Sequence, residues 1–108
     1  MLASRSEGIE QLATAFAKES ISEQAIEILT LMEENQTEFF LLSQEMGSSA
    51  QRLVLAPGPN YLCKESRFFK DDLKLMLSLG LLVEDYNSNG NPMYYFTRAA
   101  SKLVASLQ

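Results

Sequence analysis

Apolar side chains recur at helical spacing near the start of the chain. Ile9, Leu12, Ala13 and Phe16 lie three or four positions apart. This spacing predicts a helix of about three turns that begins at Ser6 and has one apolar face.

Two further helices are predicted before residue 47. Ser20 and Glu23 have the spacing of a capping box, which predicts a second helix ending at Asn35. Its apolar side carries Ala25, Ile28, Leu29 and Met32. A short third helix is predicted from Thr37 to Met46.

The stretch 47–64 is expected to be irregular. Pro57-Gly58-Pro59 excludes a helix through its middle, because proline lacks an amide hydrogen and glycine favours turns. Leu53-Val54-Leu55 fits either a helix stub or a short strand, and these two alternatives stay open.

Residues 66–107 show the strongest local signals. Apolar spacing predicts a helix from Ser66 to Leu79, followed by Gly80 at a position that favours a left-handed residue. Residues 81–83 and 93–96 read as two strands of a hairpin around Asn89-Gly90, and Thr97 caps a last helix.

The stretch DDLKLMLSLGLLVEDYNSNGNPMYYFTRAASKLV, residues 71–104, resembles the latter half of a winged helix-turn-helix domain. In bacterial regulators of the MarR and PadR types this half runs from a leucine-spaced helix through Gly-Leu-aliphatic and a polar loop to Tyr-x-Leu-Thr. The matching residues here are Leu73, Met76, Gly80, Leu81, Leu82, Tyr94, Phe96 and Thr97. LLSQEMGSS, residues 41–49, is similar to the second helix and turn of the motif.

The resemblance implies a mostly helical α+β fold, a winged helix-turn-helix with about five helices and a two-stranded β-hairpin wing. Residues 1–108 would form one domain, with an accessory helix at 1–20, a winged core at 21–96 and a C-terminal helix at 97–108. The recognition helix would be either a short helix at 49–55 or the helix at 66–79, and we favour the second. The wing tip at 87–91 lacks the Arg or Lys common in the family.

The candidate DNA contacts are cations near the favoured recognition helix. Arg67, Lys70 and Lys74 fall on one stripe of that helix, and Lys64 precedes them. Arg98, with Lys102 one turn later, would add phosphate contacts from the last helix. The alternative interpretation is a solvated face of mixed charge, since Asp71 lies within the stripe.

Composition narrows the function classes. The 108 residues carry a net charge of −5, which opposes long-range attraction to a phosphate backbone, although residues 55–108 alone carry +1. There is no histidine and one cysteine, so we predict neither an enzyme nor a metal or cofactor site. With no secretory signal or membrane-spanning stretch in view, we expect a cytoplasmic protein.

These observations leave two functional hypotheses. The first is a small DNA-binding transcriptional regulator that reads duplex DNA with helix 66–79, as a homodimer formed through the terminal helices at 6–18 and 97–107. The second is a protein–protein interaction module of adaptor or antirepressor type that does not bind DNA. The adjacent pairs Phe39-Phe40 and Phe68-Phe69 favour it, because one ring of each pair should stay half-exposed.

Overall fold

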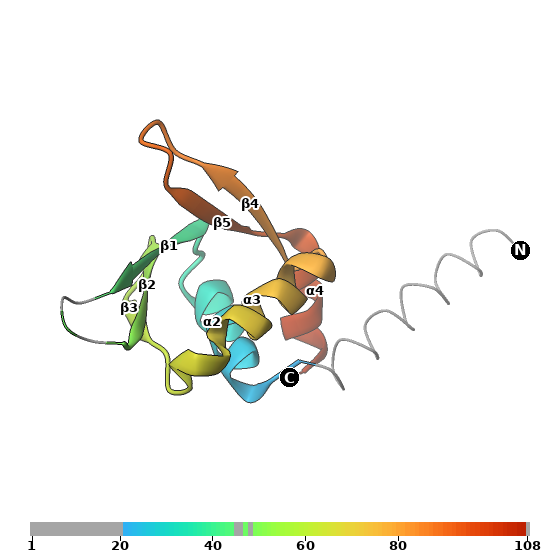
Figure 1. Cartoon of the computed structure of the whole chain (residues 1–108). Helices are drawn as coiled ribbons and strands as arrows, with labels where there is room; N and C mark the ends of the chain where they lie inside the picture. The colour runs from blue at the N-terminus through green and yellow to red at the C-terminus, as the bar shows by residue number, and fades with distance from the viewer. Residues whose placement is uncertain (1–20, 45–46, 48, 108) are drawn as a thin grey trace, which may run out of the picture.

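The computed structural model describes residues 21–44, 47 and 49–107, and the predicted helix at 6–18 lies outside them. The described helices are α2 (Glu23–Glu34), a 3-10 turn η1 (Ser66–Phe68), α3 (Phe69–Ser78) and α4 (Arg98–Ser106). The strands are β1 (Phe39–Gln44), β2 (Gln51–Ala56), β3 (Asn60–Leu62), β4 (Leu82–Tyr86) and β5 (Pro92–Phe96). The helices gather on one side of the sheet (Figure 1).

The five strands form one sheet in the order β3-β2-β1-β5-β4, and every neighbouring pair is antiparallel. The pairing of β1 with β5 joins residues far apart in sequence, as in Phe40 opposite Tyr94. Their rings lie 5.3 Å apart between centroids, a favourable aromatic contact inside the core.

Helix α2 begins two residues later than the sequence predicts. Its N-cap is Ser22, whose hydroxyl accepts a hydrogen bond from the amide of Ala25 at 3.1 Å, whereas the predicted cap Ser20 lies outside the described residues. The helix ends at Asn35, as predicted. Gln36 follows at φ 52°, in the left-handed conformation that closes many helices.

The predicted third helix at 37–46 is wrong, because residues 39–44 form strand β1. Phe39, Phe40 and Leu42 fit a helical spacing and a strand equally well when local sequence is considered alone. The sheet decides between them: β1 is hydrogen-bonded to β2 on one side and to β5 on the other. Phe40 is fully buried beneath the helices, and Phe39 points to the opposite face.

The expectation of an irregular stretch at 47–64 is also wrong, because it contains β2 and β3. Of the two alternatives for Leu53-Val54-Leu55, the short strand is correct, since these residues lie in β2. The alternative of a short recognition helix at 49–55 fails for the same reason. Pro57-Gly58-Pro59 forms the turn between the two strands, with Gly58 at φ 142°. A side chain there would bring its Cβ to 3.1 Å from both the Cβ of Leu55 and the hydroxyl of Thr37.

The local predictions for residues 66–107 are confirmed. Helical structure covers Ser66–Ser78, Gly80 has φ 73°, and β4 and β5 form the predicted hairpin around the polar turn. Thr97 caps α4 by accepting a hydrogen bond from the amide of Ala100 at 3.1 Å. In Figure 1 the turn of this hairpin projects away from the helices.

The helices and the sheet share one apolar core. Its fully buried large side chains are Phe40, Ile28, Leu29, Met32, Leu53, Met76, Leu82 and Val104. Each such burial contributes roughly 1.5–3 kcal/mol, so the core fixes the helical layer on this face of the sheet. The apolar stripe of α4, Ala100, Leu103 and Val104, is used in this core and is at most 3% exposed.

The winged helix-turn-helix with about five helices and a two-stranded wing is therefore contradicted. The described residues contain three α-helices, and the predicted wing is the outer hairpin of a five-stranded sheet. The expected second helix of the motif, at 41–49, is replaced in part by strand β1, which pairs with β5 more than fifty residues away. The longest described helix has 12 residues, and none described here has the length and apolar character to cross a bilayer.

Candidate interaction surface

Three of the five predicted DNA-contact residues lie on the solvent side of η1 and helix α3. Arg67 lies in η1 at the entry to α3, and Lys70 and Lys74 follow one turn apart; all three are exposed. The opposite side of α3 buries Phe69 and Met76. The structure thus brings Arg67, Lys70 and Lys74 together as a stripe, as the sequence predicts.

Neighbouring groups weaken this cationic stripe. The guanidinium of Arg67 lies 4.5 Å from the centroid of the Phe68 ring, whose side chain is 41% exposed. Asp71 is exposed on the same helix between Lys70 and Lys74. The stripe is therefore a mixed-charge surface with an aromatic side chain at one end.

Lys64 is directed to α2 instead of joining the stripe. Its Nζ lies 2.7 Å from the carboxylate of Glu27, and the hydroxyl of Tyr61 donates to the same carboxylate at 2.8 Å. The hydrogen bonds from Lys64 and Tyr61 lower the pKa of Glu27, and Glu27 in turn raises the pKa of Lys64. This exposed cluster ties β3 to α2 and neutralises one predicted phosphate contact.

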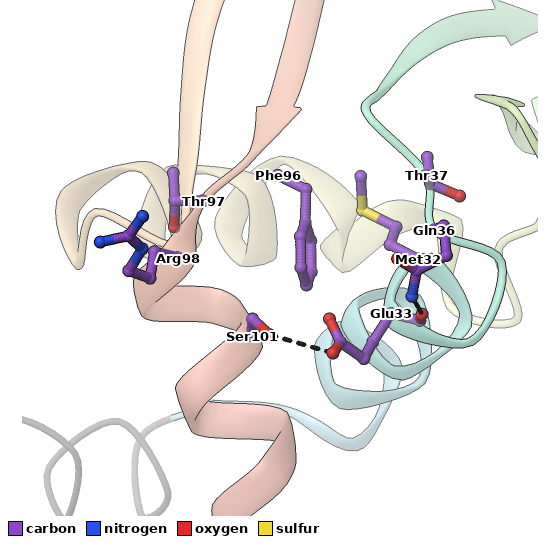
Figure 2. A pocket seen from close by; sticks show the side chains of 8 residues that line it. All are labelled: Met32, Glu33, Gln36, Thr37, Phe96, Thr97, Arg98 and Ser101. Carbon is purple, nitrogen blue, oxygen red and sulfur yellow. Dashed lines mark hydrogen bonds between the residues drawn. The ribbon is translucent and has the colours of Figure 1, made fainter.

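Arg98 lies at a cleft far along the chain from the α3 stripe. Figure 2 shows this cleft between the end of α2 and the start of α4, with the Phe96 ring standing between them. Its volume is about 340 Å³. Ser101 donates to the Glu33 carboxylate at 3.0 Å across one wall, while the guanidinium of Arg98 points outward. Arg98 therefore belongs to a separate polar cleft.

The far side of the sheet, opposite the helices, is the second candidate surface, and we name it the open face. By register its residues are Phe39, Leu41, Ser43, Arg52, Val54, Ala56, Asn60, Leu62, Val83, Asp85, Met93 and Tyr95. Its apolar members take no part in the buried core or in the side chains packed against that core, among the residues that the structure describes. No described helix therefore covers this side.

Apolar side chains occupy the middle of the open face. Leu41 of the central strand has Val54 on one side and Met93 on the other. In the next row the rings of Phe39 and Tyr95 lie 5.3 Å apart between centroids. Toward the edges Leu62 and Val83 are 55% and 53% exposed. Such a contiguous apolar patch on a folded chain marks an interaction site more often than a random surface does.

A metal site or a nucleophilic thiol at Cys63 would give the described part of the chain a chemical function. No group of three or more His, Cys, Asp or Glu side chains that could hold a metal ion occurs within it. Cys63 is 5% exposed, and desolvation, aided by the charge of Asp72, raises its pKa to about 11. A thiol protonated at neutral pH is a poor nucleophile.

Sequence reasoning missed the open face because it predicted a helix at β1 and an irregular stretch at 47–64, with a short strand at 53–55 as one of two alternatives. A signal was present, however. The runs Phe39–Leu42, Leu53–Ala56 and Met93–Phe96 are apolar at every position, which is typical of strands covered on both sides. The half-exposure predicted for one ring of each phenylalanine pair is confirmed at Phe39 and Phe68.

Comparisons with known proteins identify no relative. The chain matches no protein family, no curated protein and no solved structure. Functional conclusions therefore rest on the residues of this chain.

Proposed function

We propose that the chain is a protein-interaction module that binds through the open face of its sheet. The observation that carries this proposal is that the three central strands, β1, β2 and β5, present apolar side chains on both faces. The helices that the structure describes cover one of those faces. The single cysteine fits a reducing compartment, and we place this binding in the cytoplasm.

The pattern of the strands supports a covered face in the working state. An antiparallel sheet with one face in water alternates apolar and polar residues along each strand. The central strands break this rule, since Leu41, Val54 and Met93 stand where polar side chains would be expected. The outer strand β4 differs from them, because Glu84 and Asp85 place a carboxylate on each of its faces.

Electrostatics favour a protein partner over a nucleic acid. The chain has a net charge of −5, and the cations of α3 share their helix with exposed Asp71. Lys64 is held by Glu27. The hairpin beside α3 presents Glu84 and Asp85 and no cation at its turn. A phosphate backbone would meet little net attraction here.

Site-specific photocrosslinking in the cells that make the protein tests this proposal. A benzophenone amino acid replaces Tyr95 on the open face or, as the matched control, Lys74 on α3. Tyr95 is suitable because its ring already lies on the face and partly exposed. We expect protein adducts of discrete size from position 95 and few from position 74.

A second variant shows whether such adducts depend on the open face. Leu41→Thr with Val54→Thr places β-branched residues, which favour strands, at both positions and removes apolar area from the centre of the face. The adducts from position 95 should then fall at least tenfold. Absence of adducts at 95, or adducts insensitive to these substitutions, contradicts the proposal.

Duplex DNA binding by α3 is the second candidate function, and the shared solvent face of Arg67, Lys70 and Lys74 favours it. Three phosphate contacts would make the affinity fall about 40-fold between 50 and 200 mM salt. Fluorescence anisotropy with labelled random duplex measures this dependence. Lys70→Ala with Lys74→Ala should abolish binding, whereas Arg98→Ala with Lys102→Ala removes equal charge as the control. No binding at 50 mM salt excludes this candidate.

A further inference from the structure

We infer that the partner seated on the open face is the same face of a second copy of this chain, so that two sheets pack against each other in a homodimer. This inference rests on the proposed function and names its partner. Three properties of the face lead to it: its charge balance, its area, and its place in the fold.

Charge on the open face is balanced, although the chain as a whole is acidic. Its polar residues, Ser43, Arg52, Asn60 and Asp85, stand around the apolar centre. The face contains one cation and one anion, on opposite sides of the central strand β1. An apolar centre with a polar rim is the usual composition of a protein interface. Because the patch is neutral, a second copy meets no net repulsion across it.

The area of the open face suits a reversible dimer. Five strands about 4.8 Å apart and five residues about 3.4 Å apart give a patch of roughly 20 by 17 Å. Taken as a flat rectangle this is about 340 Å² on each copy, or roughly 700 Å² in total, and the relief of the side chains brings the buried area toward the roughly 1,200 Å² at the lower end of specific interfaces. We therefore expect dissociation in the micromolar range.

A two-fold axis through the middle of the face brings like residues together. Leu41 is central, with Val54 and Met93 beside it on the neighbouring strands. In a symmetric dimer the same patch serves both subunits, so each substitution on it acts twice. Two antiparallel sheets packed this way lie about 10 Å apart with their strands nearly aligned.

The fold directs the chain's own helical layer to the other side of the sheet. Ile21, the first described residue, is 7% exposed and belongs to the core beneath the helices. α4, at the other end of the described chain, packs against α2 in the same layer. Among residues 21–44, 47 and 49–107, no helix is therefore placed to cover the open face.

Sedimentation velocity and light scattering on the full chain between 2 and 200 µM test the inference. We expect a concentration-dependent equilibrium between monomer and dimer. Leu41→Thr with Val54→Thr should raise the dimer dissociation constant on the order of 100-fold, since apolar area is lost on both subunits. Far-ultraviolet circular dichroism and a melting curve establish that the variant is folded. If it is not, Met93→Gln on β5 replaces it.

Two control variants separate the open face from other routes to a dimer. Leu107→Thr removes an exposed apolar side chain at the C-cap of α4 and should leave the equilibrium unchanged. Phe16→Glu disrupts the apolar stripe predicted at 6–18, which lies outside the described residues. A dimer lost in Phe16→Glu but kept in the open-face variant overturns the inference in favour of terminal helices. A dimer that survives all these substitutions points to edge pairing through β4 and also overturns it.

The outcomes also distinguish this inference from the proposed function. A chain that stays monomeric at 200 µM, while position 95 still crosslinks to a different protein, refutes the homodimer and leaves the interaction module standing. A monomer without adducts at position 95 refutes both.

Discussion

Gln24 is buried where α2 meets α3, and its side-chain amide makes three hydrogen bonds there. Its Nε2 donates to Oδ2 of Asp72 at 2.9 Å and to the carbonyl of Glu65 at 3.2 Å, and the amide of Glu65 donates to its Oε1 at 2.8 Å. Ser22 donates to the other carboxylate oxygen of Asp72 at 2.8 Å. Replacing Gln24 by alanine therefore removes most of the polar connection between the two helices.

The loss of stability in Gln24→Ala follows from the hydrogen bonds that the substitution removes. Each neutral hydrogen bond contributes about 1 kcal/mol and one to a charged group about 1.5–3 kcal/mol. Gln24→Ala loses two neutral hydrogen bonds, both to the backbone of Glu65, and one hydrogen bond to the charged carboxylate of Asp72. The Asp72 side chain is 8% exposed and keeps Ser22 as its remaining side-chain partner. Partial entry of water offsets some of this, so we expect a loss of about 2–4 kcal/mol in the free energy of unfolding.

Urea unfolding followed by circular dichroism measures this loss, with Gln44→Ala as the exposed control of the same chemistry. The control should stay within about 0.5 kcal/mol of the parent. A double-mutant cycle with Asp72→Ala should give a coupling of about 1–2 kcal/mol between the two side chains. A loss below 0.5 kcal/mol for Gln24→Ala would refute the described contact between α2 and α3.

Three further predictions concern single side chains. Iodoacetamide should modify Cys63 at least about 100-fold more slowly in the folded protein than in urea at pH 8, because its pKa is raised to about 11; equal rates contradict this. Glu27→Gln should make the free energy of unfolding less dependent on pH under acidic conditions. The lowered pKa of Glu27 gives stability that is present above its unfolded pKa near 4.5 and is lost as the pH falls through the folded pKa. An unchanged pH dependence argues against the contacts to Lys64 and Tyr61. Gln36→Gly should raise the free energy of unfolding by about 0.5–1 kcal/mol, because Gln36 has φ 52°, a conformation that glycine adopts without strain. A destabilised variant contradicts this conformation.

Local signals were sufficient to predict the second half of the fold. Gly80 ends a helix in the left-handed conformation, Asn89-Gly90 turns a hairpin, and Thr97 caps the last helix. Each of these features depends on residues within a few positions, so the sequence displays it directly. The basic stripe on α3 was predictable for the same reason, since helical spacing alone places Arg67, Lys70 and Lys74 on one side.

The first half of the fold depends on partners distant in sequence. Nothing within residues 37–46 decides between a helix and a strand, and the pairing of Phe39 with Tyr95 resolves it. The resemblance to winged helix-turn-helix domains pointed to a helix there, and the sheet overrode it. A helix has no two alternating faces, so a helix predicted at β1 hides the open face centred on Leu41.

Isotope-filtered nuclear Overhauser spectroscopy tests the central claim most directly. A sample mixed from ¹³C-labelled and unlabelled full chain reports only contacts between different copies. The dimer through the open face predicts cross-peaks from the methyl groups of Leu41 and Val54 to protons of the other copy, and none from the buried methyl groups of Leu29 and Val104. Intermolecular cross-peaks confined to residues outside the open face, or no such cross-peaks at a concentration where the protein is dimeric, would contradict it.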